Sequence, residues 1–257
     1  MSKRTVAMLI LAVFVLTLGL VGCGKQAAPA QTKVLKVGAE ATFPPFEFQD
    51  EKSKEYVGFD IDLAKAIGKQ MGYQVEIQNM GFDGLIPALQ TNAIDMIASA
   101  MSITEERGQK VSFSKPYYKS GLSIVVKKDN NTINSFKDLE GKRIAVQIGT
   151  TSASEAHKIK NAQVREFNSN SEAYMELKNG GADAVMNDLP VNQYYLTQGG
   201  DKDAKLVGEV ANAEEYGLAV AKNNTELAEK VNKALDELKK NGEYDKIYEK
   251  WFGKKAK

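Results

Sequence analysis

The chain has 257 residues, of which 43% are hydrophobic and 26% are charged, and its formal net charge is +1. This composition is close to that of average soluble proteins, and the length allows one large or two modest hydrophobic cores. Because Lys and Arg are mixed with Asp and Glu rather than gathered into a basic stripe, the composition argues against a nucleic-acid partner.

The N-terminal residues have a different character from the rest. Lys3 and Arg4 precede an apolar run over residues 5–20. The run is somewhat short for a membrane-spanning helix, and a short basic region followed by an apolar stretch is typical of a secretory signal. We therefore expect residues 1–22 to be a signal peptide.

Small residues and a single Cys follow this run. Leu20-Val21-Gly22-Cys23 resembles the lipobox of bacterial lipoproteins, in which the Cys is lipidated and becomes the new N-terminus. We expect a lipidated Cys23, a flexible tether within residues 23–33, and an extracytoplasmic, lipid-anchored protein. An uncleaved membrane anchor or an incidental Cys is the alternative. Cys23 is the only Cys, so no intrachain disulfide can form.

Strand-like and helix-like segments alternate from residue 34 onward. The first predicted set is strand 34–39, helix 60–71 ended by Gly72, strand 75–78, helix 82–90 and strand 95–99. The second set is helix 135–139, strand 143–148, helix 152–160, strand 163–167, helix 171–179, strand 183–186 and helix 188–198. A helix capped by Thr225 and a helix over residues 243–252 complete the chain.

Two sets of similar size predict an α/β fold with two lobes. The strand-like runs 121–127 and 216–221 flank the second set and are expected to cross between the lobes. Residues 34–120 and 217–257 would then form lobe 1, and residues 121–216 would form an inserted lobe 2 that hinges against it.

Two helix N-termini carry hydroxyl side chains. Ser102 with Glu105, and Ser152 with Glu155, have the spacing of a capping box. The free N–H groups of a helix N-terminus suit a carboxylate or a phosphate, although most capping boxes only begin a helix. Arg107 opposes the helix dipole, so either a bound carboxylate or a neighbouring Glu explains its position.

Four further residues follow predicted strands: Glu40, Phe43, Phe82 and Asp188. Ligands in open α/β sheets bind beyond the carboxyl ends of the strands, so all four are well placed for a binding site. Each also has a structural explanation, because a Phe at such a position often packs in the core and an Asp before a helix often caps it.

Five segments carry a family resemblance: AEATFPPFEF at 39–48, VGFDIDL at 57–63, GFDGLIPAL at 81–89, SITEER at 102–107 and KWFG at 250–253. Through them the chain resembles the polar amino-acid-binding proteins of ABC importers, which are bacterial solute-binding proteins of family 3. The resemblance covers residues 34–253, and its closest subgroups bind glutamine, or lysine, arginine, ornithine and histidine. It implies a type II periplasmic-binding-protein-like fold, with two lobes joined by two strands.

The resemblance also implies a role for each site residue. Arg107, with backbone donors at Ser102 and Thr151, should hold the α-carboxylate of an amino acid. Asp188, the Ser102 hydroxyl and the Ala100 carbonyl should receive its α-ammonium. The side chain of the ligand should lie between Phe43 and Phe82. Its far end should face Glu40 and Gln147.

Glu40 and Gln147 together predict the class of ligand. Arg107 and Asp188 neutralise the two backbone charges of an amino acid, so the charge of Glu40 remains. The glutamine-binding relatives have a Lys at the position of Gln147, which balances their acidic residue. A buried unpaired carboxylate is costly, so an arginine- or lysine-type ligand is favoured, with glutamine as the second candidate.

Two functions other than transport fit parts of the sequence. His157 is the only His and Cys23 is expected to carry the lipid, so catalysis would rest on a carboxylate such as Glu40, as in a lyase or dehydratase on this scaffold. A sensor domain for amino acids is another alternative. The expectation is a monomeric, non-enzymatic binding protein that delivers its ligand to an ABC permease. It needs no cofactor or metal, because neither a phosphate loop nor a metal-ligand cluster is present in the sequence.

Overall fold

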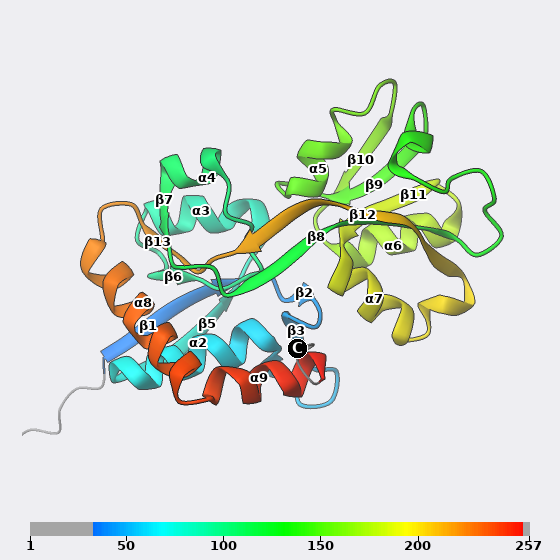
Figure 1. Ribbon diagram of the computed structural model, residues 1–257. Helices are drawn as coiled ribbons and strands as arrows, with labels where there is room; N and C mark the ends of the chain where they lie inside the picture. Colours follow the sequence, from blue (N-terminus) through cyan, green and yellow to red (C-terminus); the bar gives the residue numbers. More distant parts are fainter. Residues whose placement is uncertain (1–32, 254–257) are drawn as a thin grey trace, which may run out of the picture. The chain divides into compact units, whose positions relative to one another are not determined.

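The computed structural model describes residues 33–253 and contains two five-stranded sheets (Figure 1). In the first sheet, β1 runs parallel to β5 and β6, whereas β13 is antiparallel to β6 and β7. Its strands, in order across the sheet, are β5 (Tyr73–Asn79), β1 (Lys33–Ala39), β6 (Met96–Ile97), β13 (Ala219–Ala221) and β7 (Val111–Phe113).

The second sheet repeats the parallel arrangement and adds two long antiparallel strands. β9 is parallel to β10 and β11, and β8 is antiparallel to β11 and β12. Its strands, in order, are β10 (Gln163–Phe167), β9 (Arg143–Gln147), β11 (Ala184–Asp188), β8 (Tyr118–Lys127) and β12 (Ala204–Tyr216). A small third sheet contains β2 (Thr42–Phe43), β3 (Glu47–Gln49) and β4 (Tyr56–Val57).

Helices connect most of these strands. They are α2 (Phe59–Met71), α3 (Phe82–Gln90), α4 (Glu105–Lys110), α5 (Thr151–Ala156), α6 (Asn170–Asn179), α7 (Leu189–Thr197), α8 (Thr225–Lys240) and α9 (Glu243–Phe252), with 3₁₀ turns η1 (Phe136–Leu139) and η2 (Gly200–Lys202). None of the helices in residues 33–253 has the length and apolar character needed to span a bilayer. The predicted signal peptide, Cys23 and most of the tether lie outside the described residues.

The two-lobe α/β fold class is confirmed, and β8 and β12 run side by side between the two sheets (Figure 1). Their pairing extends from Tyr118 opposite Tyr216 to Lys127 opposite Ala204. The second connecting strand was expected over residues 216–221, and this prediction was wrong. The long strand ends at Tyr216, and β13 begins at Ala219 as a separate strand of the first sheet.

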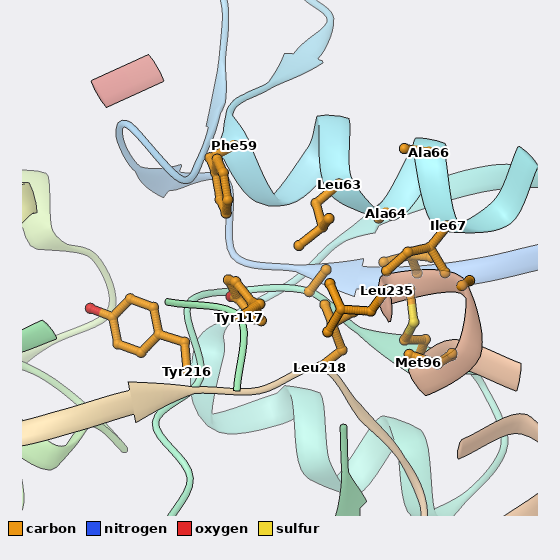
Figure 2. Packing of buried hydrophobic residues seen from close by; sticks show 14 of the residues in the cluster. Phe59, Leu63, Ala64, Ala66, Ile67, Met96, Tyr117, Tyr216, Leu218 and Leu235 are labelled. Atoms are coloured by element: carbon orange, nitrogen blue, oxygen red, sulfur yellow. The ribbon is translucent and has the colours of Figure 1, made fainter. Parts of the chain in front are cut away.

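Helix α2 shows how the sequence pattern builds the first core. Ile61, Leu63 and Ile67 are fully buried, and Gly72 ends the helix in the left-handed conformation, as expected. Figure 2 shows Leu63 and Ile67 beside Leu235 of α8. Tyr216 belongs to the same hydrophobic cluster, so the end of β12 is held in this core.

Several element ends differ from the sequence prediction. The helix expected over residues 152–160 is the shorter α5, and the helix over 135–139 is the 3₁₀ turn η1. The expected strand 95–99 is reduced to the two residues of β6. Asn224, not Thr225, caps α8, because its side-chain oxygen accepts the Leu227 N–H. The predicted helix over residues 243–252 is confirmed as α9.

Candidate functional site

Arg107 joins the two sheets through its guanidinium group. It lies in α4, and its side chain donates to the Ser102 carbonyl at 2.9 Å and to the Gly149 carbonyl, after β9, at 3.0 Å. The residue is only 9% exposed, and its guanidinium carbon lies 5.3 Å from the centre of the Phe82 ring. A guanidinium has five N–H donors, so these two bonds leave donors for an anion.

The caps of α4 and α5 differ from the expected capping boxes. Thr104 caps α4 by accepting the Arg107 N–H at 3.2 Å, and Thr150 caps α5 by accepting the Ala153 N–H at 3.2 Å. Each threonine has extended backbone angles and directly precedes its helix, which is the position a cap requires. The Ser102 hydroxyl instead donates to Glu214 of β12 at 2.5 Å.

Asp188 is the last residue of β11, at the carboxyl end of the second sheet. Its carboxylate accepts a hydrogen bond from the Tyr216 hydroxyl. Burial, and secondly the charge of Glu214, raise the pKa of Asp188 to about 8, while Tyr216 and Arg107 oppose this shift. The charge of Asp188 is therefore poorly compensated without a cationic partner.

Glu40 and Gln147 come from different sheets. Glu40 follows β1 and is 5% exposed; one carboxylate oxygen accepts from the Thr42 hydroxyl at 2.7 Å, and the other is buried without a hydrogen-bond partner. Burial raises the pKa of Glu40, and hydrogen-bond donors on Thr42 and Gln147 partly oppose the shift. Gln147 is the last residue of β9 and is also buried.

One cavity brings all of the predicted ligand-binding residues together. They are Glu40, Phe43, Phe82, Ala100, Ser102, Arg107, Gln147, Thr151 and Asp188. The parallel strands explain this convergence, because the carboxyl ends of β1, β9 and β11 all lead into the cavity. The roles of these residues stay predictions.

Two buried carboxylates near this cavity were not expected from the sequence. Glu47 lines the cavity and accepts from the Ser99 hydroxyl at 2.9 Å, and the same hydroxyl accepts the Glu40 N–H at 3.0 Å. Asp60 accepts the Ala100 N–H at 2.7 Å and the Tyr117 hydroxyl at 2.5 Å. Both residues stand between aromatic or aliphatic neighbours in the sequence, which was the available signal of burial.

The His of the chain lies outside this cavity. His157 has an exposed side chain that contacts Glu166 at 2.7 Å. Within residues 33–253, no group of three or more His, Cys, Asp or Glu side chains is arranged to hold a metal ion.

The buried carboxylates predict how stability depends on pH. Burial raises the pKa of Asp60 from 3.8 to about 7. Between about pH 4 and pH 7 the folded protein therefore keeps a proton that the unfolded chain has lost, so the free energy of unfolding should fall as pH rises. We expect urea denaturation of ligand-free protein to show a loss of at most about 4 kcal/mol from this group across that window. Asp60→Asn should flatten the fall, and stability that rose over the same window would contradict the assignment.

Comparisons with known proteins show the family. A family model described as "Bacterial extracellular solute-binding proteins, family 3" matches residues 35–254. The arginine-binding extracellular protein ArtP of Bacillus subtilis (strain 168) is 36% identical over 251 residues, which cover 95% of this chain and 97% of that protein. Two solved structures of an ancestral arginine-binding protein, one bound to arginine and one to glutamine, are each 53% identical, with TM-scores of 0.83 and 0.82; each match covers 86% of this chain and 98% of the other.

These relatives are named as binding proteins, which supports a binding rather than an enzymatic role for this chain. The family resemblance expected from the sequence motifs is confirmed by the match over almost the whole described region. The chain belongs to the bacterial extracellular solute-binding proteins, family 3.

Proposed function

We propose that this protein binds an amino acid with a basic side chain, of the arginine type, and delivers it to an ABC permease. The observation that carries the proposal is the cavity in which the Arg107 guanidinium, the Asp188 carboxylate and the free oxygen of Glu40 meet. Arg107, Asp188 and Glu40 supply one cation and two carboxylates to the cavity lining, which fits a ligand with the opposite charges, one carboxylate and two cationic groups.

The zwitterionic end of the ligand would lie against Arg107 and Asp188. Arg107 has a fork of donors that matches a carboxylate, and the backbone N–H groups at Ser102 and Thr151 would add to it. Asp188 would receive the α-ammonium, with the Ser102 hydroxyl and the Ala100 carbonyl as further acceptors. The two solved relatives with arginine or glutamine bound support a free amino acid as the ligand.

The side chain of the ligand would lie between Phe43 and Phe82. Glu40 would meet its far end, because Gln147 brings no positive charge to the cavity. A buried carboxylate that lacks a cation costs several kcal/mol, and a guanidinium removes that cost. The names of the Bacillus subtilis relative and of the ancestral protein support arginine. Glutamine is the second candidate, because the same ancestral protein has also been solved with glutamine.

The proposal also includes the location of the protein and the movement of its lobes. A signal peptide over residues 1–22 and a lipidated Cys23 would place the protein outside the cytoplasm, tethered to the membrane. Lobe 1 (residues 34–120 and 217–257) and lobe 2 (residues 121–216) would close on the ligand as a monomer. The hydrogen bond from Arg107 to Gly149, which joins the two sheets, supports closure over the cavity.

Isothermal titration of the ligand-free protein with the twenty standard L-amino acids tests the proposal. Arginine should bind most tightly, and lysine should follow. Binding should require both the α-carboxylate and the α-ammonium, so agmatine and N-acetylarginine serve as controls that each lack one of these charges. Absence of heat with every amino acid would refute the proposed function, and tight glutamine binding without arginine binding would refute the basic ligand.

A further inference from the structure

Three buried amide side chains form a hydrogen-bonded chain in the wall of the cavity, which two of them line. Asn187, in β11, donates through Nδ2 to Oδ1 of Asn170 at 2.8 Å. Asn170, at the start of α6, donates through Nδ2 to Oε1 of Gln147 at 2.7 Å. All three residues are at most 3% exposed, so water does not substitute for these bonds.

Backbone groups fix the direction of this chain at both ends. The Asp188 N–H donates to Oδ1 of Asn187 at 2.9 Å, and the Asn168 carbonyl accepts from Nε2 of Gln147 at 3.1 Å. A backbone N–H can only donate and a carbonyl can only accept, so the two ends independently impose the same orientation on every amide between them. Turning one amide alone would place like groups against each other inside the protein.

The fixed direction decides which atom of Gln147 serves the cavity. Its oxygen is held by Asn170, and one hydrogen of Nε2 goes to Asn168. The second Nε2 hydrogen is directed toward Glu40 across the cavity that both residues line, which agrees with Gln147 partly opposing the burial-raised pKa of Glu40. The unpartnered oxygen of Glu40 is an acceptor in the same cavity. The far end of the cavity therefore offers one donor and one acceptor.

We propose that the pocket also binds amino acids whose side chain ends in a neutral ureido group, because Gln147 donates where Glu40 accepts. The carbonyl oxygen of the ureido group would accept from Gln147, and its N–H groups would donate to Glu40. A guanidinium has donors only, so it gains the charge of Glu40 but leaves the donor of Gln147 without a ligand partner. This inference rests on the proposed amino-acid site.

A ligand series on the unmodified protein tests the inference. L-citrulline has the ureido group and nearly the shape of arginine, whereas L-norleucine has an apolar side chain. By isothermal titration, citrulline should bind at least about tenfold more tightly than norleucine, as expected for two hydrogen bonds of about three- to tenfold each. Arginine binding without any advantage of citrulline over norleucine would overturn this inference alone. Absence of binding by arginine as well would instead count against the proposed function.

Two substitutions change the donor of Gln147 without removing the cavity. Asn170→Asp replaces the group that donates to Gln147 with a carboxylate, which is a stronger acceptor than the Asn168 carbonyl. The Gln147 amide should therefore turn toward the carboxylate, give up its bond to Asn168 and present its oxygen. Gln147→Glu replaces the donor itself. Each variant should raise the ratio of the citrulline Kd to the arginine Kd by about three- to tenfold, as expected for the loss of one hydrogen bond.

Tyr174→Phe is the matched control. The Tyr174 hydroxyl donates to Asn192 at 2.6 Å and accepts from Asn187 at 3.3 Å, so it belongs to the same buried network but lies off the path from Asn187 to Gln147. This variant should lose stability and keep the wild-type ratio. An unchanged ratio in both Asn170→Asp and Gln147→Glu would overturn the role of the amide chain. If neither variant folds, the citrulline and norleucine comparison on the wild type still decides the proposal.

Discussion

Replacing Arg107 with alanine should weaken the binding of every amino acid by at least about a hundredfold, which corresponds to about 3 kcal/mol. The guanidinium is buried and is proposed to hold the α-carboxylate that all amino acids share. Its removal would leave that carboxylate without its cationic partner in the cavity. The loss should therefore be similar for arginine, lysine and glutamine, as measured by isothermal titration of each ligand.

Two further variants separate the role of Arg107 from the general loss of an arginine. Arg107→Lys keeps the charge but not the fork of donors, so its affinity should lie between those of the wild type and the alanine variant. Arg143→Ala removes an arginine that is paired with Asp183 at 2.6 Å and does not line the cavity. It should lower stability and leave ligand affinity unchanged. Wild-type affinity in Arg107→Ala would contradict the proposed carboxylate site.

Gly58→Ala should lower the free energy of unfolding by about 4 kcal/mol, near the upper end of single-residue effects. Gly58 has a φ of 134°, in a region that residues with a side chain rarely adopt. A Cβ atom there would lie 2.0 Å from the Phe46 carbonyl oxygen and 2.8 Å from the Glu47 nitrogen. The backbone at Phe46 and Glu47 has to move to relieve this contact. The loss of stability should therefore appear as a lower midpoint of urea denaturation.

Gly58→Ala should also alter the shape of the cavity, because Glu47 lines the cavity and would move with its own backbone. Gly84→Ala is the matched control. Gly84 lies in α3, and a Cβ at this position meets nothing within 4 Å. Alanine favours a helix more than glycine does, so this variant should keep or gain stability, by up to about 1 kcal/mol. Equal stabilities for the two variants would show that the Gly58 turn tolerates a side chain.

Regular elements were the part of the fold that local sequence patterns predicted best. Helices α3 and α9 and strand β10 have the expected bounds, because periodic apolar residues and flanking breakers act over a few neighbours. Strand β12 was not expected over residues 204–216. Only Ala204 and Tyr216, at its two ends, are buried, and its pairing is irregular near Ala211, so it shows no alternating pattern. Its partner β8, not its own sequence, holds it in place.

Local spacing also misassigned two helix caps. Ser102 and Ser152 have the right spacing to a glutamate, but Thr104 and Thr150 occupy the cap positions. A spacing rule identifies a serine and a glutamate three residues apart, whereas the cap depends on where the chain first adopts helical angles. Ser102 is consequently free to donate to Glu214, a contact across 112 positions of sequence.

The family and nine residues of the cavity lining could be predicted without a structure, because residues such as Arg107, Asp188 and Glu40 stand in motifs or at strand ends that local rules recognise. The surroundings of those residues could not be predicted. The buried carboxylates Glu47 and Asp60, and the amide chain through Asn170, have partners far away in the sequence. Burial and hydrogen-bond direction depend on these distant partners, so no local pattern contains them.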